Sequence, residues 1–144
     1  MADIRIDKEG KWFYRGAEMI RRDIIRYFYE HLKMDENGQY RIEIPGDSCN
    51  IEVEDTAFVV KSVDVRDGEI VLSLSDDSEE KLDPASLFIG KDNVLYCRVK
   101  RGTFPARFNR ASYYQLAAYL AHDEKAGYYL TLGEKRFYLS FHKS

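Results

Sequence analysis

The chain has 144 residues, of which 44% are hydrophobic, and a formal net charge of −3. That length suits one ordinary domain or two small halves that share a core. No stretch approaches the roughly 18 consecutive apolar residues of a membrane helix, no apolar secretory signal is visible at the start, and the acidic balance argues against a dedicated nucleic-acid binder, although it allows a local basic patch.

The first part of the chain predicts a hairpin, a helix and two strands. Alternation about the turn sequence DKEG indicates the hairpin. Apolar residues at three- and four-residue spacing then indicate an amphipathic helix of about four turns. The pair Asn37-Gly38 supplies the left-handed backbone that ends such a helix, after which alternation returns. The predicted elements are residues 4–14, 19–33, 40–44 and 50–55.

The middle of the chain predicts a second hairpin, over residues 57–75, because two alternating apolar runs flank the turn sequence RDG at 66–68. The acidic run at 76–80 lacks the ligand ladder of a calcium-binding loop, so a solvated turn is favoured. Asp83-Pro84 then predicts a single helical turn.

The last part of the chain repeats the order of the first. Residues 88–97 align with 5–14, so that Trp12 falls on Leu95. After five additional residues the alignment continues at a spacing of 88 through a predicted helix at 110–124 and the strands that follow. Self-similarity at a fixed period marks repeated units, which favours an internal duplication. Identities are few, and the alternative is that any two amphipathic helices followed by strands would align this well.

We therefore predict an α+β fold of two similar hairpin–helix–two-strand motifs, with an extra central β-hairpin and mostly antiparallel sheets. One such motif cannot bury its helix face well alone, so the parts should pack as one compact unit. The parts are a first repeat at 1–56, the central hairpin and connection at 57–87, and a second repeat at 88–144.

Three segments carry motifs that follow one another along nearly the whole chain: GKWFYRG at 10–16, VEDTAFVV at 53–60 and FPARFNRASYYQL at 104–116. Together they resemble a family of uncharacterised bacterial proteins known only by a domain-of-unknown-function label, with the patterns GxWxYxG, VEDxPFV and ARFxRxxYYEL. Ala17-Glu18, Ala57 and Gln115 depart from the family's Ser-Pro, Pro and Glu, and the first departure bears on how the helix begins. The resemblance implies a fold of two similar α+β motifs and a suspected role in signal transduction, with no established reaction.

The segment RVKRGTFPARFNRASYY, at 98–114, interleaves basic and aromatic side chains just before the second predicted helix. Asn109 is a natural N-cap, and unpaired amides at a helix start beside guanidinium groups suit a phosphate or carboxylate. Nearby rings would stack a base. The candidate ligand-binding residues are Arg101, Arg107, Phe108, Asn109 and Tyr113, together with Trp12 of the first hairpin.

A competing interpretation makes these side chains structural. Arg110 would pair with Glu54 or Asp55 and fix the two halves of the chain to each other, and we expect this role for Arg110 because its counterpart in the first repeat is also an arginine. We expect the binding role for Arg107, whose counterpart is not. A third interpretation of the basic segment is that it forms a protein-contact surface. Trp12 also has two interpretations: it faces outward as a surface for a partner, or it covers the edge of a small core.

Reaction chemistry is weakly indicated. Glu54 and Asp55 are neighbours on a strand and point to opposite faces, which makes them a poor acid/base pair. His31, His122 and His142 form no cluster at metal-ligand spacing with each other or with Cys49 and Cys97, and the nucleophile-elbow, P-loop and dinucleotide motifs do not occur. We therefore expect no metal and no cofactor. An enzymatic function is still not excluded, because catalytic groups can come together from distant positions in the sequence.

Cysteines without paired spacing favour a reduced compartment. We therefore expect a cytoplasmic regulatory or binding module, active in signal transduction, without evident catalysis. The alternative is a small-molecule sensor or enzyme whose anionic ligand or nucleotide lies at the start of the second helix. The expected partner is a protein or a small anionic ligand, not a membrane or a nucleic acid.

Overall fold

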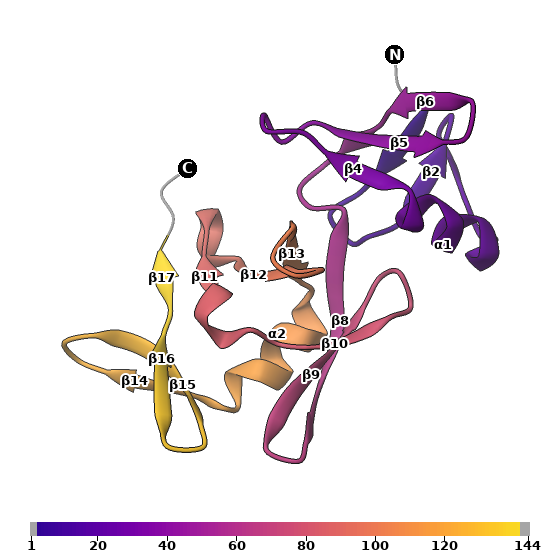
Figure 1. The fold of residues 1–144 in the computed structure, drawn as a ribbon. Coiled ribbons are helices and arrows are strands. Elements are labelled where there is room, and N and C mark those ends of the chain that lie inside the picture. The colour runs from indigo at the N-terminus through magenta and orange to yellow at the C-terminus, as the bar shows by residue number, and fades with distance from the viewer. Residues whose placement is uncertain (1–2, 142–144) are drawn as a thin grey trace. The chain divides into compact units, whose positions relative to one another are not determined.

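The computed structural model describes residues 3–141 of the chain, and His142 lies outside them. Within that range the chain forms two α-helices and mostly antiparallel sheets, so the predicted α+β class is confirmed. The chain divides into two compact units, one ending at Ala57 and one beginning at Phe58, whose elements are labelled in Figure 1.

The first unit contains one helix and two small sheets. One sheet has the strand order β3-β2-β1-β7, in which β7 runs parallel to β1, and the other has the order β4-β5-β6 and is antiparallel. The elements are β1 (Ile4–Ile6), β2 (Trp12–Tyr14), β3 (Ala17–Glu18), α1 (Arg22–Glu30), β4 (Leu32–Met34), β5 (Tyr40–Ile44), β6 (Asp47–Asn50) and β7 (Glu52–Val53).

The hairpin predicted at the start of the chain is confirmed. Its turn is held by Asp7, whose Oδ1 accepts the backbone amides of Glu9 and Lys11 at 2.9 Å each. This is the local hydrogen bonding for which Asp is favoured in turns. The turn fixes the register that pairs Ile6 with Trp12 and places both side chains in the core.

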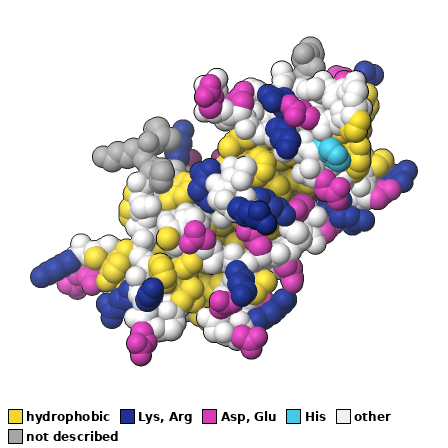
Figure 2. Space-filling view, viewed as in Figure 1, with side chains coloured by type: hydrophobic (Ala, Val, Ile, Leu, Met, Phe, Trp, Pro, Cys, Tyr) yellow, Lys and Arg dark blue, Asp and Glu magenta, His cyan; other side chains and the backbone are white. Residues whose placement is uncertain are grey.

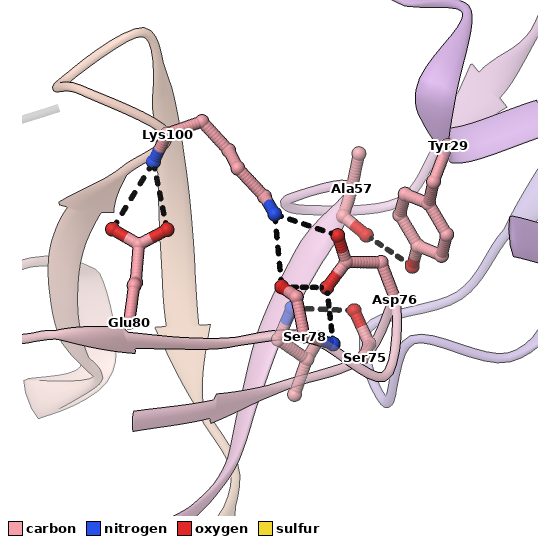
Figure 3. A network of polar contacts seen from close by, with 8 residues as sticks. Tyr29, Ala57, Ser75, Asp76, Ser78, Glu80 and Lys100 are labelled. Atoms are coloured by element: carbon pink, nitrogen blue, oxygen red, sulfur yellow. Dashed lines mark hydrogen bonds and ion pairs between the residues drawn. The ribbon is translucent and has the colours of Figure 1, made fainter. Parts of the chain in front are cut away.

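Trp12 is the central side chain of the first unit's core. It is 1% exposed, its ring centroid lies 4.9 Å from that of Tyr29 in an edge-on contact, and it stacks on Phe28 at 5.9 Å. The hydroxyl of Tyr29 in turn donates a hydrogen bond to the carbonyl oxygen of Ala57 at 2.8 Å (Figure 3). Trp12 is therefore a core residue and not an exposed aromatic, which corrects its inclusion among the binding candidates.

The second unit contains a larger sheet, with the order β10-β9-β8-β13-β12-β11-β17, and a three-stranded antiparallel sheet, β14-β15-β16. Two pairs in the larger sheet are parallel, β8 with β13 and β11 with β17. The elements are β8 (Phe58–Arg66), β9 (Glu69–Leu74), β10 (Glu79–Lys81), η1 (Pro84–Ser86), β11 (Phe88–Ile89), η2 (Lys91–Asn93), β12 (Leu95–Val99), β13 (Phe104–Phe108), α2 (Arg110–Ala117), β14 (Leu120–Asp123), β15 (Gly127–Leu132), β16 (Lys135–Tyr138) and β17 (Ser140–Phe141).

The second unit contains the predicted central hairpin and the predicted helical turn. Strands β8 and β9 pair around Asp67-Gly68, both of which have positive φ. The carboxylate of Asp83 accepts the amide of Ala85 at 3.1 Å and so caps the short helix η1. The hairpin is not a separate part, because β8 pairs with β13 and joins the sheet of the second unit.

The two units share element order and strand register. In the first unit Leu32 pairs with Ile42, and in the second Leu120 pairs with Leu130, which are the positions 88 residues later. The hairpins correspond in the same way, since Ile89 pairs with Leu95 as Ile6 pairs with Trp12. These matches define which positions are equivalent. Their origin in a duplication stays a prediction.

Both helices are shorter than predicted. The predicted helix 19–33 is the helix Arg22–Glu30, and the predicted helix 110–124 is the helix Arg110–Ala117. Each is followed at once by a further strand, β4 or β14, so that four strands follow each helix, β4 to β7 and β14 to β17, where two were predicted. Asn37-Gly38 therefore belongs to the turn between β4 and β5 and does not end the helix. The apolar residues of these short strands also fit the three- and four-residue spacing of the preceding helix. The alternation typical of a strand therefore cannot be recognised there from the sequence.

The acidic run at 76–80 contains the predicted turn, but only part of it is solvated, with Asp77 and Glu79 exposed. Asp76 is paired with Lys100 at 2.7 Å, and its side chain is only 12% exposed. The Oδ1 atom of Asp76 accepts the amide and hydroxyl of Ser78, and the backbone amide of Lys100 donates to the carboxylate of Glu80. Figure 3 shows Lys100 extending from Glu80 toward Asp76 and Ser78. This group of residues ties the β9–β10 turn to the end of β12.

We expect Asp76→Ala to destabilise the protein by on the order of 2 kcal/mol, because it removes a partly buried ion pair and two hydrogen bonds to a charged oxygen. Asp76→Asn keeps an oxygen for Ser78 and removes only the charge, so it should lose less. Urea unfolding midpoints of the two variants check this. Wild-type stability of Asp76→Ala would show that the ion pair contributes nothing.

Candidate functional site

Asn109 caps the second helix, as predicted. Its side-chain oxygen accepts the backbone amide of Ser112 at 2.8 Å. Phe108, just before the cap, is buried in β13, and Arg110 is the exposed first residue of α2. The helix start is thus built as the sequence indicates, but the Ser112 amide is already satisfied from within the chain.

The structure gathers only part of the predicted binding site. Phe108, Asn109 and Tyr113 lie together at the start of α2, with Arg107 on the strand that leads to it. Arg101 lies in the turn between β12 and β13, with φ 58°, at the opposite end of β13 from Asn109. Trp12 belongs to the core of the other unit. An anion site at the helix start stays a prediction, and it lacks the contribution of Arg101.

The predicted ion pairs involve residues of both units. Glu54 accepts hydrogen bonds from the guanidinium of Arg5 at 3.3 Å and from the amide of Lys8 at 3.1 Å, all within the first unit. A pairing of Arg110 with Glu54 or Asp55 would join the units and stays a prediction.

Helix α2 is anchored to strand β8 by polar contacts with one carbonyl oxygen. The oxygen of Val60 accepts the hydroxyl of Ser112 at 2.7 Å and the backbone amide of Asn109 at 3.2 Å. One turn further on, the side-chain oxygen of Gln115 accepts the amide of Val63 at 2.6 Å. The hydrogen bonds hold the face of α2 that carries Ser112 and Leu116 against the sheet, and both residues are fully buried.

The first helix buries a different face. In α1 the buried side chains are Ile25 and Tyr29, whose equivalents in α2 are Tyr113 and Ala117. Because successive helical residues are about 100° apart, the buried face of α2 is displaced by one residue, so that Tyr113 is exposed and Ala117 is half-buried.

An open cavity of about 330 Å³ lies where these two residues face the rest of the second unit. Its walls come from α2, from the short helix η2, from the strands β11, β12, β14, β15 and β17, and from the segment between β16 and β17. They are Ile89, Asn93, Leu95, Tyr113, Ala117, Leu120, Tyr128, Leu139 and Phe141. Tyr113 is the one predicted ligand-binding residue among them.

The same region of the first unit is filled by side chains. By element order and register, Leu95 is equivalent to Trp12, Ala117 to Tyr29 and Leu139 to Ile51. Trp12, Tyr29 and Ile51 are all buried. The second unit therefore has Leu and Ala where the first has Trp12 and Tyr29, and the cavity occupies the corresponding space.

Sequence reasoning missed Leu95, Ala117 and Asn93. The signal that would have found the first two is in the alignment of the repeats, where two large aromatic residues are replaced by smaller aliphatic ones.

Other chemistry in the described part of the chain is structural. No group of three His, Cys, Asp or Glu side chains within residues 3–141 is arranged to hold a metal. A polar cavity of about 450 Å³ in the first unit is lined in part by Arg5, Gln39 and Glu54. Arg5 donates to the carboxylate of Glu54, and the side-chain amide of Gln39 donates to the carbonyl of Ile51. Burial raises the pKa of the Cys97 thiol, and the nearby carboxylates of Glu80 and Asp83 add to this. A thiol so held is a poor nucleophile.

On the face drawn in Figure 2, Lys and Arg side chains are interspersed with Asp and Glu, and hydrophobic side chains lie exposed between them. That face carries no continuous stripe of one sign. Within residues 3–141, no helix has the length and apolar character needed to cross a membrane.

Comparisons with known proteins agree with the fold described above. Residues 1–56 match the N-terminal domain of DUF1285, a domain of unknown function. A crystal structure of a DUF1285 family protein from Silicibacter pomeroyi DSS-3 superposes with a TM-score of 0.78 at 22% identity, over 96% of this chain and 79% of that one. A second, from Shewanella baltica OS155, gives a TM-score of 0.69 at 19% identity, over 82% of this chain and 92% of that one. None of the curated proteins compared matches the chain.

The chain is thus an α+β protein of two units that share one plan, with an apolar cavity in the second. Its residues 1–56 match the N-terminal domain of DUF1285 and its fold is that of two solved DUF1285 family proteins, which confirms the resemblance drawn from the motifs.

We expect Asn109→Ala to lower the stability of the protein by about 1 kcal/mol, because the amide of Ser112 loses its cap. Asn109→Ser retains a side-chain oxygen at the cap and should lose only a few tenths of a kcal/mol. Thermal or urea unfolding distinguishes the two. Equal losses would mean that the cap hydrogen bond is not what stabilises the start of α2.

We expect the two cysteines to differ sharply toward a thiol alkylating reagent. Cys49 is exposed on β6, whereas Cys97 is buried. Under native conditions iodoacetamide should modify Cys49 alone, and modification of Cys97 should require unfolding, since burial both hides the thiol and disfavours its thiolate. Mass spectrometry of the intact and digested protein reads this out. Rapid native labelling of Cys97 would contradict the burial described here.

Proposed function

We propose that this protein is a cytoplasmic binding module without catalysis of its own, and that its second unit takes up a small, largely apolar molecule. The observation that carries the proposal is the open cavity of about 330 Å³ beside α2. Its size lies at the lower end of the range of roughly 300–1,000 Å³ typical of small-molecule sites.

The composition of the walls supports binding. Most of the lining side chains are aliphatic or aromatic, and the polar groups are the amide of Asn93 and the hydroxyls of Tyr113 and Tyr128. Mainly apolar walls with a few polar groups that fix orientation are characteristic of ligand pockets. Water in such a cavity finds few partners, so a ligand that displaces it gains affinity.

The location of the cavity supports a regulatory role. Its walls combine the helix with strands from both sheets of the second unit. A ligand there would contact elements that otherwise have an open volume between them, and would stabilise that arrangement. A partner protein that reads the arrangement would make the module a component of signal transduction.

A titration with the neutral dye N-phenyl-1-naphthylamine, followed by its fluorescence, tests the site. We expect one dye to bind per chain. Ala117→Leu fills part of the cavity and should weaken binding at least tenfold. The matched control is Ala118→Leu, which adds the same side chain at the next, exposed position and should bind as the wild type does. If the dye fails to bind, or if Ala117→Leu binds it as well as Ala118→Leu does, the cavity is not a ligand site.

A further inference from the structure

We infer that the ligand of this cavity is a neutral molecule built on a planar aromatic ring, an inference that rests on the proposed function. The first unit serves as an internal template, because it shows which groups fill the equivalent volume when the chain itself supplies them. They are two aromatic rings, the indole of Trp12 and the phenol of Tyr29.

The missing volume in the second unit corresponds to these rings. The backbone positions are equivalent in strand register, and the side chains change from Trp12 to Leu95 and from Tyr29 to Ala117. The flanking positions retain side chains of similar type, since Ile6 corresponds to Ile89 and Leu32 to Leu120. These two wall positions are thus kept while the two rings between them are absent.

The rim of the cavity favours aromatic contacts. Tyr113, Tyr128 and Phe141 line it and remain 39%, 46% and 64% exposed. In the first unit, Trp12 makes one edge-on and one stacked ring contact with its neighbours. Ring pairs of this kind contribute to stability beyond the area that they bury. A planar aromatic ligand would gain them, and a saturated ring would not.

The polar groups of the cavity favour a neutral ligand. None of its lining residues is charged, so a charged group inside would lose hydration without an ionic partner. Asn93 offers an amide that both donates and accepts, and its backbone is held in the left-handed region at φ 60°. A neutral ring with one hydrogen-bonding substituent therefore fits the walls.

Three compounds with one ring each separate these features: benzamide, cyclohexanecarboxamide and benzoate. They differ in whether the ring is aromatic or saturated and in whether the substituent is neutral or charged. Titration calorimetry on the full chain should give benzamide an affinity about tenfold higher than either of the others, as the ring contacts and the cost of charge burial imply.

Variants that restore the residues of the first unit provide the second arm. Ala117→Tyr and Leu95→Trp place aromatic rings in the cavity, and at least one of them should raise the melting temperature of the unliganded protein and abolish benzamide binding. Ala118→Tyr is the matched control and should do neither. If Leu95→Trp destabilises the protein, the test rests on Ala117→Tyr alone.

The possible outcomes are distinct. Binding of cyclohexanecarboxamide or benzoate as tightly as benzamide would overturn this inference and leave the proposed ligand site standing. Binding of none of the three compounds, together with failure of N-phenyl-1-naphthylamine, would overturn both. If a Trp-containing peptide binds in the cavity and benzamide does not, the occupant is a partner protein's side chain, and the inference of a small aromatic ligand is wrong.

Discussion

The carbonyl oxygen of Val60 is the contact on which the arrangement of the second unit depends. It lies in β8, beside an irregularity in the β8–β9 pairing, and it accepts hydrogen bonds from both Ser112 and Asn109. A buried carbonyl and a buried hydroxyl each cost free energy if left unpaired. Helix α2 therefore has one favourable rotation about its axis, the one that brings Ser112 to β8. Leu116 is buried with it, and the positions of Tyr113 and Ala117 follow.

The parallel pairing of β8 with β13 is what brings the Val60 carbonyl to the helix. Strand β13 runs directly into α2, so its neighbour β8 passes beside the first turn of the helix. The first unit has no strand in that place within the part of the chain that is described, and α1 buries Ile25 and Tyr29 on a filled core. The two units thus share their strand register but differ in the packing of their cores, because the helix of the second unit packs against the additional hairpin.

The features that were predicted correctly from the sequence are those that depend on interactions between residues close together in the chain. Turn residues located both hairpins, and Asn109 was recognisable as a cap, because each acts through hydrogen bonds within a few residues. The helix ends were predicted wrongly, since Leu32 and Leu120 fit helical spacing as well as they fit a strand paired with β5 or β15. The rotation of α2 was out of reach, because Ser112 and Val60 are separated by 52 residues and nothing in either neighbourhood indicates the other.

The unfilled cavity lowers the free energy of unfolding of the second unit, and packing by itself gives no reason to keep it. Large-to-small changes in a core lose transfer free energy and leave unfilled volume, at a cost of several kcal/mol for a Trp or Tyr ring. The rotation of α2 explains why Ala117 is not buried against the sheet, but it does not explain why a Leu and an Ala remain where larger side chains would fill the space. Substitutions that fill cavities are among the easily found stabilising changes, and where they carry a cost, the recurrent one is loss of function. A Leu and an Ala at these positions therefore agree with the ligand site that we propose for this cavity.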